Sequence, residues 1–458
     1  MSSPKFTVAI CGGGVGGLVL AVALAKYRDI QVEVYEAAKQ FSDIGAGVGM
    51  WPRTWRIMEL LGLDQELAKV AIVPPLNIPK VAFTMRKGDE PLGRTFDDLV
   101  TPGGMITFHR PDFQRILLNH LSATSCRLHT RKRLAAYEYD HAHVSEPDRS
   151  AIQIQFEDGT SATCDVLVGA DGIKSRVRTK MLGQLASDLE ASGSVREAQA
   201  ALSGIDPVWS GHLMYRTTFP AEDLEQHYHG HRALHQPMIY LGRDAQITAY
   251  PIARGTRVNV AAACVNWDLE NTPFDGPWVQ DVPRQEVGDV FSRWEVEAQA
   301  LLRCSPIMSR WAIHTIRPLN TFVFGRIALL GDAAHAMLPY QGSGAGQAVE
   351  DALILATALG HSLTSRRTIP RALKIYDTIR RPFAQAVAQK SRDNGLLFTL
   401  NHSNSLFNAF AQQPSNDDTL MRLQVLRSQI RANWEWAWNT TIDPDVERVS
   451  QLLAEEES

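Results

Sequence analysis

The chain contains two glycine-rich segments that are able to bind a ligand, and each directly follows a short apolar run. The pattern Gly12-x-Gly14-x-x-Gly17 follows residues 6–11, and the run Gly331 to Gly346 follows residues 327–330. Where a strand turns through glycines into a helix, free backbone N–H groups and the helix dipole favour a bound anion. Because the two segments are more than three hundred residues apart, we predict one extended ligand that is held at both ends.

The first segment has the order of a dinucleotide-binding βαβ unit, with a strand, a helix rich in Ala and Leu and a second strand around the glycines. Gly12 allows the tight turn, Gly14 lets the backbone approach a pyrophosphate, and Gly17 lets the helix pack closely on the strand. Glu36 ends the second strand, where a carboxylate accepts hydrogen bonds from a ribose. The residues predicted to bind the dinucleotide are Gly12, Gly14, Val15, Gly17 and Glu36.

The second segment carries an acid but no phosphate-binding signature. An ionised carboxylate only accepts hydrogen bonds, so Asp332 suits hydroxyl groups of the ligand. A helix that begins near Gly344 directs its free N–H groups toward the same ligand. His335, in the same run, is more typical of a structural histidine than of a catalytic base. The residues predicted to hold this end of the ligand are Asp332, Gly344, Ala345 and Gly346.

Three further segments contain residues suited to a nucleotide ligand. A Gly-Ala-Gly stretch at 45–47 leads into a helix after residue 53, and Arg110 stands at the start of an amphipathic helix. An apolar strand at 165–169 is followed by Asp171-Gly172 and by a second helix start. Each segment alone fits an ordinary strand, turn and helix. Their order along one chain is a more specific signal.

In this order, the segments resemble the class A flavoprotein aromatic hydroxylases, the family typified by salicylate and para-hydroxybenzoate hydroxylases. The resemblance covers nearly all of residues 5–395 and implies FAD as the cofactor. It implies that the Gly-Ala-Gly stretch runs along the flavin, that the arginine reaches the flavin and its phosphates, and that the Asp-Gly pair lies near the pyrophosphate. The second glycine-rich segment would bind the ribityl chain and the isoalloxazine ring. The additional cofactor residues implied are Ala46, Gly47, Val48, Arg110 and Asp171.

The resemblance also implies a reaction. NADH or NADPH reduces FAD, O2 adds to give a flavin C4a-hydroperoxide, and one oxygen atom passes to a phenolic aromatic acid. Attack at the carbon that bears the carboxylate releases CO2, so oxidative decarboxylation of a salicylate-type substrate is included. Three alternatives stay open: a hydroxylase or epoxidase of a larger aromatic natural product, a flavin-dependent reductase that transfers no oxygen, and a non-catalytic FAD-binding protein.

The substrate-contacting residues are predicted from two segments and one departure from the family. Salicylate hydroxylases similar to this chain carry a His in a Pro-His-Gln-Gly segment, where this chain has Tyr340, a poor base because its ordinary pKa is about 10. Relatives place substrate-facing residues on the strand that here contains His212 and Tyr215, which face opposite ways because their numbers differ by three. We favour Tyr215. The family usually has Asn after the proline that corresponds to Pro52, and this chain has Arg53 there. The change is expected to place a guanidinium near the cofactor or a substrate carboxylate.

Three parts of the predicted fold position these residues. The fold class is α/β: a Rossmann-like FAD-binding domain, an intertwined β-sheet substrate domain with strands over 213–219, 238–241, 246–252 and 257–265, and a C-terminal helical segment. The expected division is 1–75, 104–185 and 305–370 for the FAD-binding domain, 76–103 and 186–304 for the substrate domain, and 371–458 for the helical region.

Two other stretches are expected to be structural. Residues 182–204 are rich in Ala and Ser and predict a surface helical insertion without chemistry. Trp434, Trp436 and Trp438 follow at spacings of two, which spread them around a helix, and they predict packing against the flavin domain.

Composition excludes several other classes of protein. A net charge of -4, with 45% hydrophobic and 21% charged residues, is ordinary for a globular protein and gives no reason to expect nucleic acid as a partner. The five cysteines form no CxxC pair and have no histidine spacing typical of a metal site, so we expect no bound metal and a reducing compartment. We expect no signal peptide, no membrane span, a cytoplasmic location, and a monomer or homodimer whose partners are an aromatic substrate and O2.

Overall fold

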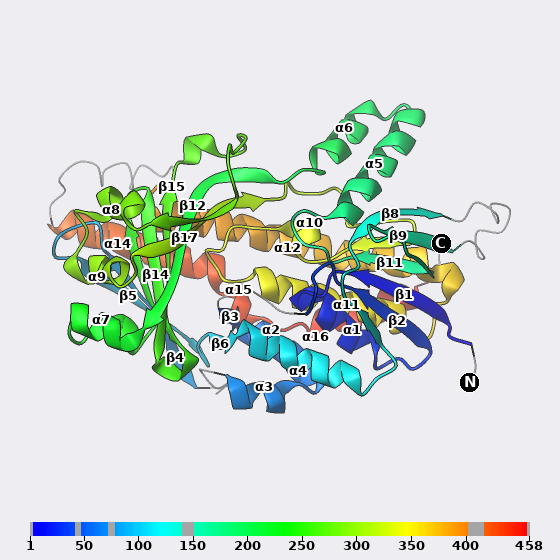
Figure 1. Cartoon of the computed structure of the whole chain (residues 1–458), viewed down its shortest axis with the longest axis horizontal. Helices are drawn as coiled ribbons and strands as arrows, with labels where there is room; N and C mark the ends of the chain where they lie inside the picture. Colours follow the sequence, from blue (N-terminus) through cyan, green and yellow to red (C-terminus); the bar gives the residue numbers. More distant parts are fainter. Residues whose placement is uncertain (1–2, 42–46, 72–77, 140–150, 402–415, 456–458) are drawn as a thin grey trace.

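Two large sheets lie toward opposite ends of an elongated molecule in the computed structural model, which describes residues 3–41, 47–71, 78–139, 151–401 and 416–455 (Figure 1). Helix α12 (Ile369–Phe398) runs from one sheet to the other. Near its start, the Asp377 carboxylate accepts a hydrogen bond from the Phe322 N–H beside the first sheet. Just after its end, the Thr399 carbonyl accepts from the Asp244 N–H beside the second sheet. The α/β fold class expected from the sequence is therefore confirmed.

The first sheet positions both glycine-rich segments. In the described part of the chain it has six strands, and β1 pairs in parallel with β2 on one side and with β11 on the other, while β11 pairs in parallel with β19. The carboxyl ends of β1, β11 and β19 therefore meet at one edge, where ligands bind in open parallel sheets. The strand order is β18 (Val323–Phe324), β19 (Ile327–Leu329), β11 (Val166–Gly169), β1 (Phe6–Cys11), β2 (Ile30–Tyr35) and β7 (Arg127–His129).

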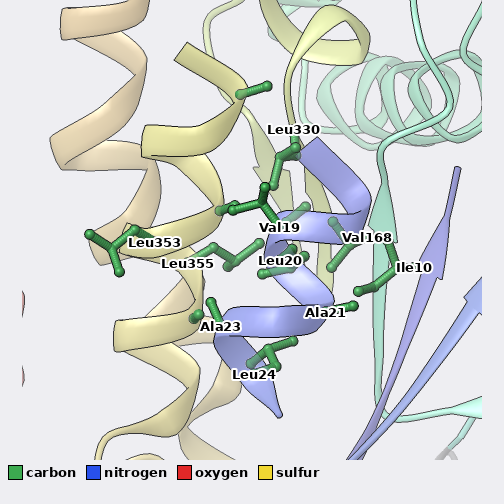
Figure 2. Close-up of a cluster of buried hydrophobic side chains, with 14 of the residues drawn as sticks. Ile10, Val19, Leu20, Ala21, Ala23, Leu24, Val168, Leu330, Leu353 and Leu355 are labelled. Carbon is green, nitrogen blue, oxygen red and sulfur yellow. The ribbon is translucent and has the colours of Figure 1, made fainter. Parts of the chain in front are cut away.

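Helix α1 (Val15–Leu24) is buried along its whole length because every one of its ten residues is apolar or glycine. It packs between the sheet and helix α11 (Gly344–Gly360), and Figure 2 shows Ile10 and Val168 on the sheet side and Leu353 and Leu355 on the α11 side. Sandwiched in this way, α1 fixes the first glycine turn relative to the helix that follows the second glycine-rich segment.

The second sheet has eight strands within the described ranges, antiparallel except for the β13–β4 pair. Helices α7 (Ala221–His227), α8 (Gln285–Phe291) and α9 (Val296–Arg303) contribute to the core on one face, which leaves the other face for a ligand. The strand order is β16 (Val279–Pro283), β17 (Ile307–Thr315), β12 (Val208–Pro220), β15 (Arg257–Val265), β14 (Ala245–Ile252), β13 (Met238–Gly242), β4 (Pro79–Lys87) and β5 (Arg94–Pro102).

The remaining elements connect or cover these sheets. The other strands of the described ranges form one two-stranded sheet and one three-stranded sheet. The strands of these small sheets are β3 (Gly47–Met50), β6 (Ile106–His109), β8 (Leu134–Tyr139), β9 (Ile152–Phe156) and β10 (Ser161–Cys164). The other helices are α2 (Pro52–Leu61), α3 (Asp64–Val70), α4 (Arg110–Ser122), α5 (Arg176–Ala191), α6 (Val195–Ser203), α10 (Asp332–His335), α14 (Asn416–Trp434), α15 (Trp436–Asn439) and α16 (Asp443–Ala454).

The predicted insertion at 182–204 lies in a helical hairpin, formed by α5 and α6, that projects from the body of the molecule (Figure 1). The C-terminal helices instead pack against the structure around both large sheets. Arg431 of α14 donates to the Asp97 carboxylate of β5, and α16 contributes Val449 and Leu453 to the core of the first unit. No helix within the described ranges is long and apolar enough to cross a membrane. The exact division into domains stays a prediction.

Candidate functional site

A cavity of about 580 Å³ lies between the two large sheets. One wall comes from the glycine turn of β1, the strand β3, the Gly172 turn and the segment 330–345. The other comes from the open face of the second sheet and from α12 and α14. All the glycine-rich segments singled out in the sequence therefore meet at one cavity.

The first glycine turn has the geometry predicted from the sequence. Gly12 has φ +114°, a backbone conformation that favours glycine. A Cβ atom on Gly17 would lie 2.0 Å from the Gly12 carbonyl oxygen, so the close approach of α1 to β1 requires glycine there. Gly14, Val15 and Gly17 line the cavity, and a Cβ on Gly14 would meet open space. The backbone is therefore accessible to a phosphate at the N-terminus of α1.

Glu36 lies at the end of β2 and is oriented by the same turn. Its carboxylate accepts hydrogen bonds from the Gly13 N–H and the Ala38 N–H, each at 2.7 Å. Glu36 is not one of the residues that line the cavity. Its proposed contact with a ribose places it farther along an extended cofactor than the cavity itself reaches.

The Asp171-Gly172 turn contacts the cavity through its glycine, and this corrects our prediction for the acid. Gly172 lines the cavity, whereas the Asp171 carboxylate accepts from the Ser175 hydroxyl at 2.6 Å and from the Arg176 N–H at 2.7 Å. Asp171 thus satisfies free N–H groups at the start of α5. Burial raises the pKa of this carboxyl.

Arg178 connects the Asp-Gly turn to the second glycine-rich segment. Its guanidinium donates to the Ile173 carbonyl at 2.6 Å and to the Ala333 carbonyl at 3.0 Å. Ala333 directly follows Asp332, so one buried side chain ties the two turns together. Burial lowers the pKa of Arg178 to about 10, which leaves it charged at neutral pH.

Asp332 lines the cavity with an exposed carboxylate, as the predicted acceptor of ligand hydroxyl groups requires. Asp351 of α11 holds the turn before Asp332. Its carboxylate accepts from the Gly331 N–H at 3.1 Å and pairs with His335 Nε2 at 2.5 Å. Burial raises the pKa of Asp351, but the charges of His335 and Arg380 outweigh it and the net pKa is lowered. His335 is therefore a buried partner of Asp351, in agreement with the structural role predicted for it.

The start of α11 lines the cavity with Gly344 and Ala345. Gly346 does not line it; a Cβ there would lie 2.8 Å from the Thr54 hydroxyl, so this glycine serves the packing of α11 on α2. Strand β3 contributes Gly47 and Val48 to the cavity wall. Ala46 lies outside the described residues.

Arg110 lines the cavity at the start of α4, next to β3, because β6 and β3 pair with Gly47 opposite His109. Its contact with the flavin stays a prediction. On the second sheet, Arg216 also lines the cavity. Burial lowers the pKa of Arg216; Tyr250 opposes this shift, and the Arg110 guanidinium adds a smaller lowering.

Tyr215 lies on the opposite face of the second sheet from the cavity, and this corrects its assignment as the leading substrate residue. Its hydroxyl donates to the Glu286 carboxylate of α8 at 2.9 Å, and its side chain belongs to the core beneath α7–α9. Its neighbours Met214 and Arg216 line the cavity instead. Tyr215 thus takes the face of β12 that packs against the helices, and the residues on either side of it take the face toward the cavity. Arg216, which the sequence prediction missed, was identifiable as the charged residue on the alternate face.

Arg216 is a cation in contact with an aromatic ring and has no ion-pair partner within the described parts of the chain. Its guanidinium carbon lies 5.4 Å from the centre of the Trp311 ring. Trp311 pairs with Met214 across β17 and β12 and also lines the cavity. The Arg216 guanidinium is suited to bind an anion.

His212 is fully buried beside the cavity without lining it. Its Nδ1 donates to the Ser210 carbonyl at 2.7 Å, which leaves the Nε2 lone pair free, and Nε2 has no partner in the described part of the chain. Burial lowers the pKa of His212 to about 4, so the ring is neutral at pH 7. Its ring meets that of Tyr340 edge-on at 5.6 Å between centres.

Tyr340 lines the cavity, and its hydroxyl is buried without a hydrogen-bond partner among the described residues. Burial raises the pKa of Tyr340, so it is protonated at neutral pH and is a donor rather than a base. Its ring packs against Gly395 of α12, where a Cβ would lie 2.6 Å from the tyrosine ring.

Arg53 points away from the cavity, which corrects the prediction of a guanidinium near the cofactor or substrate. It is 3% exposed, donates to Glu350 of α11 at 3.2 Å and pairs with Asp445 of α16. Its guanidinium also lies 4.5 Å from the Phe383 ring. Arg53 therefore joins α2 to the C-terminal helices.

The far end of the cavity has an aromatic wall that includes Phe83, Phe398 and Trp434. The Trp434 ring contacts Trp51 edge-on at 5.2 Å and stacks on Phe83 at 5.7 Å. Packing against the flavin domain holds for the contacts of Trp434 and Trp438 with Trp51, but Trp434 also stacks on Phe83 of the second sheet and lines the cavity. No local pattern in the sequence signals this, because the contact depends on how α14 docks.

The cavity has the features that a flavin dinucleotide needs. A Cβ on Gly14, Gly172 or Gly344 would meet open space, so the cradle is open along its length. A guanidinium at Arg110 and two helix N-termini suit negative charge, and the Asp332 carboxylate suits hydroxyl groups. The residues present therefore fit such a group.

Comparisons with known proteins agree with this geometry. The model of the FAD binding domain family matches residues 5–391. The chain is 34% identical to a salicylate hydroxylase of Pseudomonas putida, over 97% of this chain and 94% of the relative. It is 32% identical to a 6-methylsalicylate 1-monooxygenase of Aspergillus terreus, over 87% and 84%. A solved salicylate hydroxylase substrate complex is similar with a TM-score of 0.78 and 28% identity, over 98% of both chains.

Proposed function

Because the chain belongs to the FAD binding domain family of flavoprotein monooxygenases, we propose that it hydroxylates a phenolic aromatic acid of the salicylate or hydroxybenzoate type. It is an FAD-dependent aromatic monooxygenase with NAD(P)H and O2 as co-substrates. Bound FAD supplies the oxygen activation that amino-acid side chains lack. The protein binds the ring, orients it and excludes water.

The observation that carries the substrate proposal is Arg216. A partly desolvated guanidinium without an acid partner in the described ranges lines the cavity. A substrate carboxylate completes this ion pair by accepting two parallel hydrogen bonds from the planar guanidinium. The only acid among the described lining residues is Asp332, on the cofactor side, so nothing on the substrate side repels an anionic ring.

The surfaces around Arg216 suit a flat apolar ring. Met214, Ile239 and Ile313 line the sheet side of the cavity together with Phe83 of β4, and Phe398 of α12 lines the same wall. Contact with these side chains removes water from the ring and limits its orientation, so the carboxylate and the reacting carbon take fixed places.

The substrate hydroxyl is best placed toward Tyr340. Because burial keeps the tyrosine protonated, it donates a hydrogen bond to the substrate oxygen and favours the ionised, more electron-rich ring. His212 stays neutral beside it and offers its Nε2 lone pair. In this arrangement Tyr340 holds its proton at Oη and does not act as the base.

Turnover of the FAD-loaded protein tests the proposal. NADH or NADPH oxidation and O2 uptake are measured with a panel of hydroxybenzoates, and the hydroxylated product and CO2 are assayed. We expect ring hydroxylation stoichiometric with NAD(P)H, with CO2 release when the carboxylate is on the attacked carbon. Oxidation that yields only H2O2 with every member of the panel would reject this substrate class.

A further inference from the structure

Two buried donors at the aromatic end of the cavity have no acceptor among the residues that the structure describes. The Tyr340 hydroxyl and the Trp434 indole N–H make no hydrogen bond to any described residue. Both residues line the cavity, and their side chains are 4% and 2% exposed. Buried polar groups in folded proteins are nearly always paired, so two such donors in one cavity wall require an explanation.

The surroundings of the two donors are aromatic. The Trp434 ring is packed by Trp51, by Phe83 and, at 6.3 Å, by Phe398. Phe398 also contacts Tyr340, and the two rings meet edge-on with their centres 5.7 Å apart. The aromatic rings around Trp434 and Tyr340 offer no oxygen acceptor to either donor, and a ligand in the cavity that both residues line would supply one.

Hydrogen bonds between their immediate neighbours fix the two donors relative to each other. Gln341, the residue after Tyr340, is fully buried and donates to the carbonyl of Asn433, the residue before Trp434, at 3.0 Å. Trp436 donates in turn to the Gln341 side-chain oxygen at 3.2 Å. The C-terminal helices are therefore clamped onto the loop that carries Tyr340.

We propose that Trp434 is a substrate-binding residue whose indole N–H, together with the Tyr340 hydroxyl, donates to the phenolic oxygen of the substrate. The proposal rests on the proposed function and extends it, because it makes the C-terminal region part of the substrate site. An indole N–H only donates, so the pair selects a ring oxygen that accepts two hydrogen bonds, as a phenolate does. Arg216, on the sheet side, remains available for the carboxylate.

Ligand binding to the FAD-loaded protein tests this role without turnover. The dissociation constants of 2-hydroxybenzoate and benzoate are measured from the change in flavin absorbance, for the wild type and for Trp434→Phe, which keeps an aromatic ring and removes the N–H. We expect the variant to weaken 2-hydroxybenzoate binding roughly 5- to 20-fold, the usual effect of losing one hydrogen bond. Benzoate, which lacks the phenolic oxygen, is expected to change less than about 2-fold.

Trp438→Phe is the matched control, because Trp438 also packs against Trp51, at 5.5 Å, but does not line the cavity. It is expected to leave both dissociation constants unchanged. FAD content and the thermal midpoint check that each variant is folded. If Trp434→Phe does not fold, Trp434→Leu removes the same N–H with a smaller apolar side chain and is expected to give the same selective loss.

The outcomes separate this inference from the proposed function. Equal weakening of both ligands, or no change in either, overturns the role of Trp434 while hydroxybenzoate turnover by the wild type still stands. If the wild type binds none of the hydroxybenzoates, the substrate class of the proposed function falls and this inference falls with it. Loss confined to 2-hydroxybenzoate, with the control unchanged, supports the inference.

Discussion

Arg53 and Arg380 share one oxygen of the Glu350 carboxylate. Oε2 accepts from Arg53 Nε at 3.2 Å and from Arg380 Nη1 at 2.9 Å, and all three side chains are buried. Arg380 also donates to Asp351 at 2.9 Å, and Asp351 holds the turn before Asp332. A buried ionic cluster thus joins α2, α11 and α12 directly below the cavity wall.

The first prediction concerns the stability that Arg53 provides. Removing one partner of a buried ion pair leaves an uncompensated charge, so Arg53→Met is expected to lower the free energy of unfolding by about 3 kcal/mol. Denaturant unfolding measures this. Arg56→Met, which removes a half-exposed pair with Asp443, is the control and is expected to change stability little. A large increase in KM without loss of stability would return Arg53 to the substrate site.

The second prediction concerns Arg216. Arg216→Met is expected to raise KM for a hydroxybenzoate roughly 30-fold, because hydrogen bonds to a charged group contribute about 1.5–3 kcal/mol. KM for the corresponding phenol without the carboxylate is expected to stay close to the wild-type value. Arg310→Met is the matched control, because Arg310 on the neighbouring strand donates to Glu286 at 2.9 Å on the far face of the sheet. Equal effects on both substrates would contradict the carboxylate contact.

The third prediction is that Tyr215→Phe retains hydroxylation at the wild-type rate. Its hydroxyl bonds Glu286 on the face away from the cavity, so its loss is expected to cost about 1 kcal/mol of stability and nothing in kcat. Steady-state kinetics and denaturant unfolding check the two parts. A loss of product formation with unchanged stability would place Tyr215 in the chemistry after all.

The fourth prediction concerns FAD retention. Asp332→Ala removes the exposed acceptor on the cofactor side of the cavity and is expected to weaken FAD binding roughly 10-fold. The recovery of flavin fluorescence on dilution measures the release of FAD. Asp188→Ala, on the exposed side of α5, is expected to leave retention unchanged. Equal retention by both variants would remove Asp332 from the cofactor site.

The fifth prediction is a dependence of stability on pH through His212. Its pKa is about 4 in the folded protein and about 6.5 when unfolded. The unfolded state therefore binds the proton more tightly, and stability that is fully present above about pH 6.5 falls as the pH drops toward 4, by about 3 kcal/mol in total.

Between pH 7.5 and pH 5 the wild type is expected to lose about 2 kcal/mol more stability than His212→Gln. Urea unfolding at the two pH values measures the difference. The same pH dependence in both proteins would show that His212 is not buried in its neutral form.

The cofactor side was predictable from the sequence because it is encoded locally. The tight turn at Gly12 and the close approach at Gly17 are properties of a few consecutive residues, and the structure confirms both. Asp171 is a partial exception: the turn is correct, but its carboxylate satisfies the start of α5 instead of facing the cavity. A sequence pattern places a turn more reliably than it places each side chain of that turn.

The substrate side depends on packing between distant segments. Alternation predicted that His212 and Tyr215 face opposite ways, yet only the packing of α8 against one face decides which of them lies near the ligand. The Arg53 side chain is oriented by ion pairs with Glu350 and Asp445, which are 297 and 392 residues away in the chain. Trp434 reaches the cavity because α14 docks there. None of these choices follows from local periodicity.

The strand order of the first sheet has a consequence for how this protein folds. In its centre Val8 pairs with Val166, and Leu167 pairs with Ile327, so neighbouring strands come from widely separated parts of the chain. Closing such long loops costs entropy before any contact compensates for it, which makes this topology slow to form. Until β11 arrives, β1 has one unpaired edge and an exposed apolar surface. The strand that presents the dinucleotide turn is therefore the part of the nascent protein most exposed to aggregation.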